Sequence, residues 1–315
     1  MDIDTRIYIF NGFLDSGKTS FILDTILDTD FCEGEKTLLI VSEEGEIEYI
    51  QEKVEAVNCD LVYISNEDDF TYSFFLSLQE KYNPTQVLIE LNGMYNTNRI
   101  LAAKKPLGWE VVQILTTINA QTFNLYVNNM RSLVYNQVVH SDLVIINRID
   151  DTMKKSFLRN TIKAINSSVQ IIYEKADGTV NTMEDDELPF DTNSDYLEIL
   201  DHDFGIFCMD SLDHPETYDQ KTIKIRGKFI GLDKHIPHGF ILGREAMVCC
   251  ADDTSLIGMV CVHQSCKQLI PNEWLELEGK VYLRYDEELN GNIDVLYVTD
   301  LKVIPPLENE YVTFD

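Results

Sequence analysis

The sequence lacks any long apolar stretch. Among its 315 residues, no run approaches the roughly eighteen consecutive apolar side chains of a membrane-spanning helix, so no such helix is expected. The amino-terminal residues Met1-Asp2-Ile3-Asp4 are acidic and have the character of neither a signal peptide nor a transit peptide. These absences predict a cytoplasmic protein without direct membrane insertion.

Basic residues are scarce. Only 25 lysine and arginine residues stand against 54 aspartate and glutamate residues, which gives a formal net charge of −29. Such a field repels phosphate backbones and anionic lipid surfaces, so nucleic acid is not expected as a partner. Solubility explains most of the charge, although cations and basic protein surfaces stay open as partners. A nucleotide is also an anion and would need local hydrogen-bond donors and Mg²⁺.

The cysteines do not form an even disulfide framework. There are seven, and in a cytosolic protein they are expected to be thiols or metal ligands. Cys249, Cys250, Cys261 and Cys266 lie near the carboxyl terminus and, with His263, suggest a site for Zn²⁺ or another divalent transition metal. Their spacing matches no known zinc knuckle, and neighbouring residues on a strand point to opposite faces. Small buried side chains in a β core are the alternative interpretation.

What is present first is an alternation of strand-like and helix-like segments up to about residue 175. Apolar, β-branched runs recur at residues 37–41, 61–64, 87–89, 111–118, 143–146 and 169–173. Helix-length segments lie between several of them, at residues 71–82, 121–139 and 153–166, and the second repeats apolar side chains every three or four positions. This pattern predicts an α/β domain over residues 1–175, with a mostly parallel sheet covered on both faces.

The composition changes after this domain. Residues 176–215 are rich in acids, including Glu184-Asp185-Asp186-Glu187, and are interpreted as an exposed linker. Over residues 216–315 the helical pattern stops, strand-like runs follow one another, and Asn290-Gly291 is a hairpin signal. These features predict a small all-β domain, an OB-like barrel.

Residues 12–19, Gly-Phe-Leu-Asp-Ser-Gly-Lys-Thr, form a complete G-x-x-x-x-G-K-[ST] phosphate loop. The loop lies between a strand-like run and a helix-like stretch, where main-chain N–H groups can hold phosphate. Lys18 is expected to reach the β- and γ-phosphates, and the Thr19 hydroxyl is expected to bind Mg²⁺. The nucleotide-binding residues expected in this segment are Gly12, Asp15, Ser16, Gly17, Lys18, Thr19 and Ser20.

A second motif supplies a carboxylate. Glu90 ends an apolar strand-like run and is expected to hold Mg²⁺ together with Thr19, while Gly93 lets the main chain approach the γ-phosphate. Lys18, Thr19 and Glu90 are therefore the predicted catalytic residues.

A third motif suggests guanine as the base. Asn147-Arg148-Ile149-Asp150 is close to the guanine-reading pattern Asn-Lys-x-Asp. Asp150 can accept hydrogen bonds from N1–H and the exocyclic amine of guanine, a donor pair that adenine lacks. Arg148 stands in place of lysine and can lie along the base. An Asp-rich turn after a strand is the alternative interpretation. GTP with Mg²⁺ is the predicted ligand.

The segment Ser42-Glu43-Glu44-Gly45-Glu46 admits two interpretations. It follows a strand-like run where a GTPase carries a switch or metal-relay loop. As a motif it is non-specific, and an exposed acidic turn is the favoured interpretation.

Together these motifs resemble those of CobW-type GTPases, in the same class as the urease and hydrogenase nickel-insertion GTPases. The family patterns Gly-Phe-Leu-Gly-x-Gly-Lys-Thr-Thr, Glu-x-x-Gly and Asn-Lys-x-Asp correspond to residues 12–20, 90–93 and 147–150. The resemblance covers about residues 5–175 and implies Mg²⁺-dependent GTP hydrolysis coupled to handling a transition metal. The Cys-x-Cys-Cys motif of the family is absent, because the sequence at the expected place is Asn66-Glu67-Asp68-Asp69.

Two functions follow from these predictions. One is a GTP-hydrolysing metal chaperone or insertase that serves a client metalloprotein. The other is a nucleotide-gated adaptor that regulates a partner such as a membrane permease and carries no metal; residues 243–253 resemble part of an uncharacterised bacterial family often associated with predicted permeases. Dimerisation across the nucleotide is common in the resembled GTPase class, so a homodimer is a further expectation to test.

Overall fold

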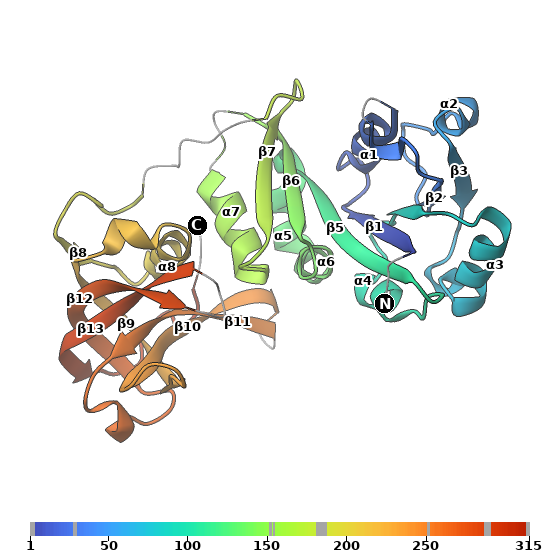
Figure 1. The fold of residues 1–315 in the computed structure, drawn as a ribbon. Coiled ribbons are helices and arrows are strands. Elements are labelled where there is room, and N and C mark those ends of the chain that lie inside the picture. Colours follow the sequence, from blue (N-terminus) through green and yellow to red (C-terminus); the bar gives the residue numbers. More distant parts are fainter. Residues whose placement is uncertain are drawn as a thin grey trace. The chain divides into compact units, whose positions relative to one another are not determined.

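The computed structural model describes residues 4–27, 30–150, 153, 155–180, 188–250, 253–286 and 291–312. The chain divides into two compact units (Figure 1). The first contains Met1–Met153 and Asn166–Met183, and the second contains Lys154–Ile165 and Glu184–Asp315.

The first unit is built on a parallel sheet. Within the described residues, its seven strands follow the order β3-β2-β4-β1-β5-β6-β7, and neighbouring strands are parallel. The strands are β1 (Thr5–Asn11), β2 (Thr37–Val41), β3 (Cys59–Tyr63), β4 (Gln86–Glu90), β5 (Trp109–Asn119), β6 (Leu143–Ile149) and β7 (Gln170–Lys175). β2 and β4 are buried along their whole length, as interior strands of a sheet covered on both faces should be.

Helices cover both faces of this sheet. Ile7 and Ile9 of β1 share an apolar cluster with Phe75, whereas Phe10 shares another with Ile22. Because successive strand residues point to opposite faces, the two clusters lie on opposite sides of the sheet. The helices of this unit are α1 (Lys18–Leu27), α2 (Gln51–Glu55), α3 (Tyr72–Tyr82), α4 (Thr97–Ala102), α5 (Ala120–Asn129) and α6 (Arg131–Val138), with short 3-10 turns at η1 (Asp30–Cys32) and η2 (Glu67–Asp69). The predicted α/β class is confirmed.

The second unit contains the predicted barrel. Its strands are β9 (Thr222–Leu232), β10 (Gly239–Cys250), β11 (Asp253–Val262), β12 (Trp274–Asp286) and β13 (Gly291–Val303). In the described part of the chain these strands pair in the order β9-β10-β11-β13-β12, and β9 also pairs with β12, which closes the ring. A closed five-stranded barrel of this kind is the OB-like architecture that the sequence predicted.

The segment that we interpreted as a linker contains regular structure. Strand β8 (Tyr196–Glu198) pairs in parallel with β9, and helix α8 (Phe204–Asp213) packs on the barrel. Leu197 and Phe207 belong to the barrel's apolar core. Short 3-10 turns follow at η3 (Pro215–Tyr218) and η4 (Cys266–Gln268). The acidic run at residues 184–187 lies outside the described residues.

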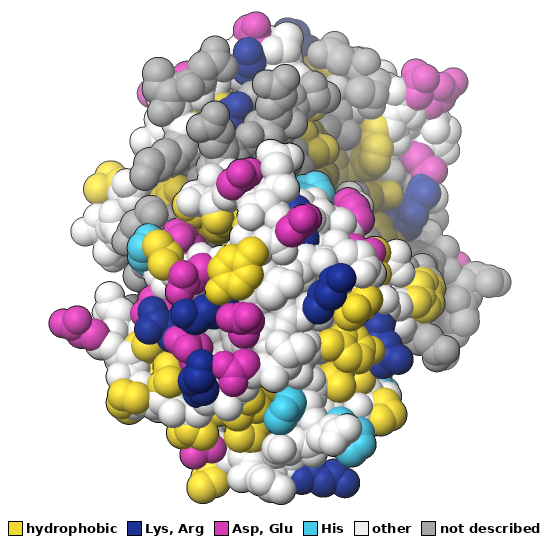
Figure 2. All heavy atoms as spheres, turned by 90° about the vertical axis from the view of Figure 1, so that its left-hand side faces the viewer, with side chains coloured by type: hydrophobic (Ala, Val, Ile, Leu, Met, Phe, Trp, Pro, Cys, Tyr) yellow, Lys and Arg dark blue, Asp and Glu magenta, His cyan; other side chains and the backbone are white. Residues whose placement is uncertain are grey.

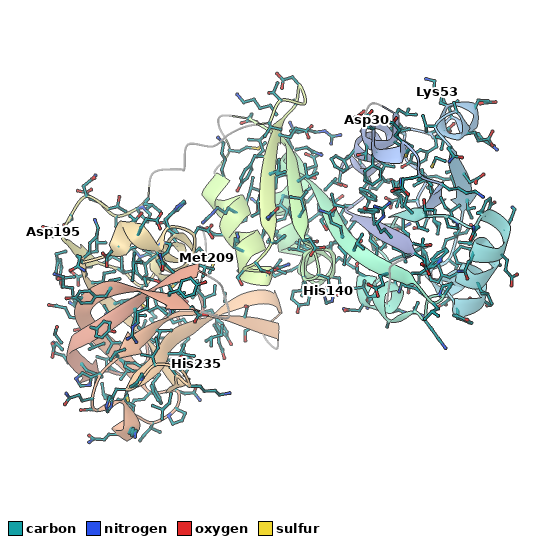
Figure 3. The ribbon with its side chains drawn as sticks, in the orientation of Figure 1. Asp30, Lys53, His140, Asp195, Met209 and His235 are labelled. Atoms are coloured by element: carbon teal, nitrogen blue, oxygen red, sulfur yellow. The ribbon has the colours of Figure 1, made fainter. Side chains whose placement is uncertain are left out.

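Helix α7 (Lys155–Ile165) belongs to the second unit, although it lies in the sequence between β6 and β7. Ala164 is part of the barrel's apolar core. Arg159 donates to the main-chain oxygen of Met209, which lies on α8 (Figure 3), at 3.4 Å, and it also pairs with Asp213. Lys163 lies 3.7 Å from the same carboxylate. The strand–helix pattern places this helix in the domain predicted for residues 1–175, whereas these contacts join it to residues beyond 200.

The exposed face of the second unit mixes charges of both signs (Figure 2). Across β8, β9, β12 and β13, Lys224 pairs with Glu198 at 2.9 Å and approaches Glu276 at 3.9 Å, while Lys302 pairs with Asp300 at 2.6 Å. Partly exposed pairs of this kind keep a sheet face solvated and add little stability.

Candidate functional site

The phosphate loop joins β1 to α1 in a tight main-chain turn. Gly12 and Gly17 have φ values of +139° and +98°, which glycine adopts without strain. A Cβ at Gly12 would lie 2.4 Å from Ser16 Oγ, and a Cβ at Gly17 would lie 2.7 Å from Asn147 Nδ2. Side chains therefore pack closely against both glycines, and a larger residue at either position would displace the loop. Ser16 contributes to this packing, because its hydroxyl lies 2.7 Å from that of Thr117.

Lys18 folds back over the loop that precedes it. Its ammonium donates to the main-chain oxygens of Gly12 and Phe13, at 2.8 and 2.9 Å, and to a carboxylate oxygen of Glu43 at 2.5 Å. The Lys18 side chain is only 3% exposed. The positive charge is thus held at the mouth of the loop, where phosphate oxygens would be attracted.

Thr19 and Glu90 meet beside this lysine. The Thr19 hydroxyl donates to Glu90 at 2.7 Å, and the Tyr49 hydroxyl donates to the other carboxylate oxygen at 2.6 Å. Burial raises the pKa of the Glu90 carboxyl, while the two hydrogen bonds and the charge of Lys18 act in the opposite direction. Adjacent hydroxyl and carboxylate oxygens are ligands that suit Mg²⁺, so the residues present fit this ion.

The Asn147–Asp150 motif contacts the main chain of the phosphate loop. Asn147 Nδ2 donates to the main-chain oxygen of Ser16 at 2.7 Å, and Arg148 donates to that of Asp15 at 2.8 Å. Among the described residues, the buried Asn147 Oδ1 has no hydrogen-bond partner. A buried acceptor without a donor costs free energy, so this atom fits a ligand that brings N–H groups, as a purine does. Asp150, which follows the end of β6, is exposed.

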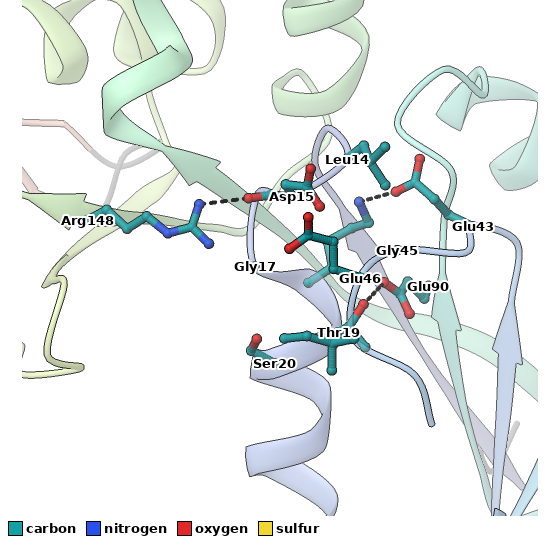
Figure 4. Close-up of a pocket in the computed structure, with 12 residues that line it drawn as sticks. Leu14, Asp15, Gly17, Thr19, Ser20, Glu43, Gly45, Glu46, Glu90 and Arg148 are labelled. Atoms are coloured by element: carbon teal, nitrogen blue, oxygen red, sulfur yellow. Dashed lines mark hydrogen bonds and ion pairs between the residues drawn. The ribbon is translucent and has the colours of Figure 1, made fainter. Parts of the chain in front are cut away.

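These residues surround a pocket of about 100 Å³ (Figure 4). The predicted site residues that line it are Asp15, Gly17, Lys18, Thr19, Ser20, Glu90 and Arg148. Gly12, Ser16 and Asn147 instead support the loop, and a Cβ on Gly93 would lie 2.5 Å from the main-chain oxygen of Gly12. Four carboxylates and two cationic side chains line the pocket, so an anionic ligand is best accommodated together with a metal ion.

Two family descriptions match the chain in succession. The CobW/HypB/UreG nucleotide-binding domain matches residues 6–173, and the DUF1980 C-terminal domain matches residues 174–313. The chain belongs to the CobW/HypB/UreG family. It is a P-loop GTPase of the CobW type, as the three motifs predicted, and its carboxyl-terminal part matches an uncharacterised domain, as also expected. No curated protein matches the chain in sequence.

Two solved structures of this class are similar to the chain. The hydrogenase maturation factor HypB of Archaeoglobus fulgidus is 17% identical, over 55% of this chain and 83% of that chain, with a TM-score of 0.40. The Zn(II)-bound YjiA GTPase of E. coli is 14% identical, over 88% of this chain and 86% of that chain, with a TM-score of 0.44. Within the described residues, no helix is long and apolar enough to cross a membrane.

Three side chains at the site of this CobW-type GTPase, Glu43, Glu46 and Tyr49, are not among the predicted site residues. Glu43 and Glu46 lie in the segment interpreted as a switch loop or an acidic turn. Glu43 contacts Lys18, and Tyr49 contacts Glu90. Their contacts join positions 25 and 41 residues apart in the sequence, so no local spacing could have indicated them.

The acids and cysteines considered as metal ligands in this CobW-type chain are paired or buried where the structure describes their side chains. At the place where family cysteines were expected, Glu67 pairs with Arg99 at 2.6 Å and Asp68 pairs with the same guanidinium. Cys261 and Cys266 are buried in the second unit, and burial raises the pKa of the Cys261 thiol. The side chains of Cys249 and Cys250 lie outside the described part of the structure.

Among the described residues, no group of three histidine, cysteine or acidic side chains is arranged to hold a metal. His263 is half-buried, and its ring nitrogen Nδ1 lies 3.3 Å from the main-chain N–H of Ser265. The proposed transition-metal site therefore stays a prediction.

Proposed function

We propose that this chain binds GTP with Mg²⁺ and hydrolyses it, and that hydrolysis switches the protein between two states. Lys18 binds the β- and γ-phosphates, and main-chain amides of residues 16–19 stabilise the charge that develops on the transferring phosphoryl group. Asn147 and Asp150 select guanine. The contact of Thr19 with Glu90, beside Lys18, is the observation that carries this proposal.

Mg²⁺ would be held by Thr19 and Glu90. When bound, it neutralises phosphate charge during transfer. Among the protein's own groups, the Tyr49 hydroxyl donates to the Glu90 oxygen that Thr19 does not contact.

The Lys18→Ala variant tests this assignment. Binding of GTP should weaken by roughly a hundredfold, because the ammonium is the main cation of the phosphate loop, and hydrolysis should be lost. The matched control is Lys53→Ala on α2, since Lys53 is exposed and lies outside the pocket. Calorimetric titration with Mg²⁺ and GTP measures binding. Undiminished turnover in Lys18→Ala would refute the role of this lysine.

For the biological output of the switch, family membership supports a metal chaperone or insertase. In this proposal the chain delivers Zn²⁺ or another divalent transition metal to a client metalloprotein, and GTP hydrolysis times the release. The ligand candidates are those that the sequence predicted: Cys249, Cys250, Cys261, His263 and Cys266.

A second output, a nucleotide-gated adaptor, is favoured by helix α7. The base-reading motif, which ends at Asp150, precedes this helix in the sequence, and α7 packs in the second unit. A change at the base-reading turn can therefore reach the barrel along the chain itself. In this proposal the second unit docks on a partner such as a membrane permease, and no metal is carried.

Metal analysis of the full chain, purified without chelator, separates the two outputs. Stoichiometric metal that disappears in Cys249→Ser/Cys250→Ser supports the chaperone. The adaptor is supported if the protein is metal-free and a non-hydrolysable GTP analogue changes the hydrogen exchange of amides in α7 and α8. These amides belong to residues 155–165 and 204–213.

A further inference from the structure

The loop after β2, residues 42–50, makes direct contacts with two groups of the nucleotide site; we call it the latch loop. It begins on the end of β4, because the N–H and hydroxyl of Ser42 both donate to the main-chain oxygen of Glu90, at 3.0 and 2.9 Å. The same hydroxyl accepts from the N–H of Asn92 at 2.9 Å. The start of the latch loop is thus tied to the strand that carries the Mg²⁺ ligand.

Near its start, the latch loop occupies Lys18. An ammonium has three N–H donors, and those of Lys18 are engaged by Gly12, Phe13 and Glu43. The first two partners are main-chain oxygens of the phosphate loop itself. A phosphate that binds Lys18 must therefore take the place of Glu43, whose carboxylate also lies 3.4 Å from the N–H of Gly93.

At its other end, the latch loop holds Glu90. Tyr49 is 7% exposed, and its hydroxyl donates to one carboxylate oxygen of Glu90 while Thr19 donates to the other. Both oxygens of the metal ligand are therefore engaged by hydroxyl donors. A cation that binds Glu90 and Thr19 competes with these hydrogen bonds, just as phosphate competes with Glu43.

We propose that the latch loop is an intramolecular competitor for Mg²⁺ and GTP: Glu43 takes the place of phosphate on Lys18, Tyr49 occupies one carboxylate oxygen of Glu90, and the two contacts are released together when the nucleotide binds. The proposal rests on the GTP site proposed above. Once phosphate holds Lys18, the Glu43 and Glu46 carboxylates face added negative charge in the same pocket. Like charges repel, so the loop moves away and reports the bound nucleotide.

The Glu43→Gln variant of the full chain tests the competition. Removal of the competing charge should strengthen binding of Mg²⁺-GTP about tenfold. Glu44→Gln is the matched control: it removes the same charge from the neighbouring position, where the side chain is exposed and does not line the nucleotide pocket. Equal strengthening in both variants, or weaker binding in Glu43→Gln, would overturn the proposal.

Hydrogen exchange at residues 42–50 tests the release. In the wild-type protein, exchange should rise when Mg²⁺ and a non-hydrolysable GTP analogue bind, and Glu43→Gln and Tyr49→Phe should show raised exchange beforehand. Tyr49→Phe should also need several-fold less Mg²⁺ for half-maximal hydrolysis, because its hydroxyl no longer competes for the Glu90 carboxylate. Increased protection of the loop on binding would mean that it closes, which contradicts the latch.

The outcomes of these experiments distinguish a failure of the latch-loop proposal from a failure of the proposed GTP site. If wild-type protein binds no GTP, the proposed function fails. If it binds GTP and Lys18→Ala does not, but Glu43→Gln binds like wild type, the site stands and the latch alone is wrong.

Discussion

At the residue scale, the functional signal lies in main-chain geometry and in paired side chains. The glycines of the phosphate loop and the identity of Lys18 and Thr19 could be predicted from sequence because their spacing is fixed by one turn of chain. The partners of these residues could not. Glu43 reaches Lys18 from the latch loop, and Tyr49 reaches Glu90 across 41 positions. Such contacts depend on strand order, which local spacing does not encode.

Selection of guanine is a prediction at this scale. In Asp150→Asn, one acceptor of the carboxylate becomes a donor that faces guanine N–H groups, so the preference for GTP over ATP should fall at least about tenfold. Competition titrations measure the preference. Inosine triphosphate, which lacks the exocyclic amine, is the chemical control: wild type should discriminate against it and Asp150→Asn should not. An unchanged preference removes Asp150 from the base site.

At the element scale, long periodic segments were predictable and short ones were not. The strand–helix alternation yields the sheet, but residues 121–139 form two helices that break at Met130, whose φ of −138° is not helical. Strand β8 and helix α8 were missed because they are short and follow a run of acidic residues. Their burial follows from the barrel beside them, which no local pattern reveals.

The packing of β13 against α8 has a pH dependence of its own. Asp294 on β13 is 7% exposed, and burial raises its pKa to about 6, against which a hydrogen bond with Ser211 of α8 acts. The buried thiols of Cys208 and Cys261 lie close enough to feel its charge. Because the folded state binds this proton more tightly than the unfolded state, stability should fall as pH rises from about 4 to about 6 and then level off.

The Asp294→Asn variant should therefore lack this fall. Near pH 7.5 we expect it to be more stable than wild type by about 2 kcal/mol, and near pH 4 we expect the two to be nearly equal. Urea unfolding gives the free energy of unfolding of both proteins across this pH range. The difference between the two proteins reports Asp294, because the other titrating groups contribute equally to both. A difference that does not change with pH would show that Asp294 is not the group responsible.

At the scale of the whole molecule, the family match and the packing divide the chain at different places. The matched segments meet at residues 173 and 174, whereas α7 lies before that point and packs with residues beyond it. The sequence predicted a boundary at 175 because strand and helix alternate up to there. It could not reveal α7's partners, since the apolar stripe of an amphipathic helix does not itself specify which surface covers it.

A fragment of residues 1–175 should fold its sheet and leave α7 without partners. Arg159 and Lys163 lose Asp213, and Ala164 loses the barrel core. Amides of residues 155–165 should then exchange at least about tenfold faster than in the full chain, because their opening is no longer opposed by packing.

Amides of β1 serve as the internal control and should be unchanged. In the full chain, Asp213→Ala removes only the ion pairs and should give a smaller increase at the same amides. Equal protection of α7 in the fragment and the full chain would mean that the sheet alone holds this helix, and the covalent route from the base-reading turn to the barrel would lose its physical basis.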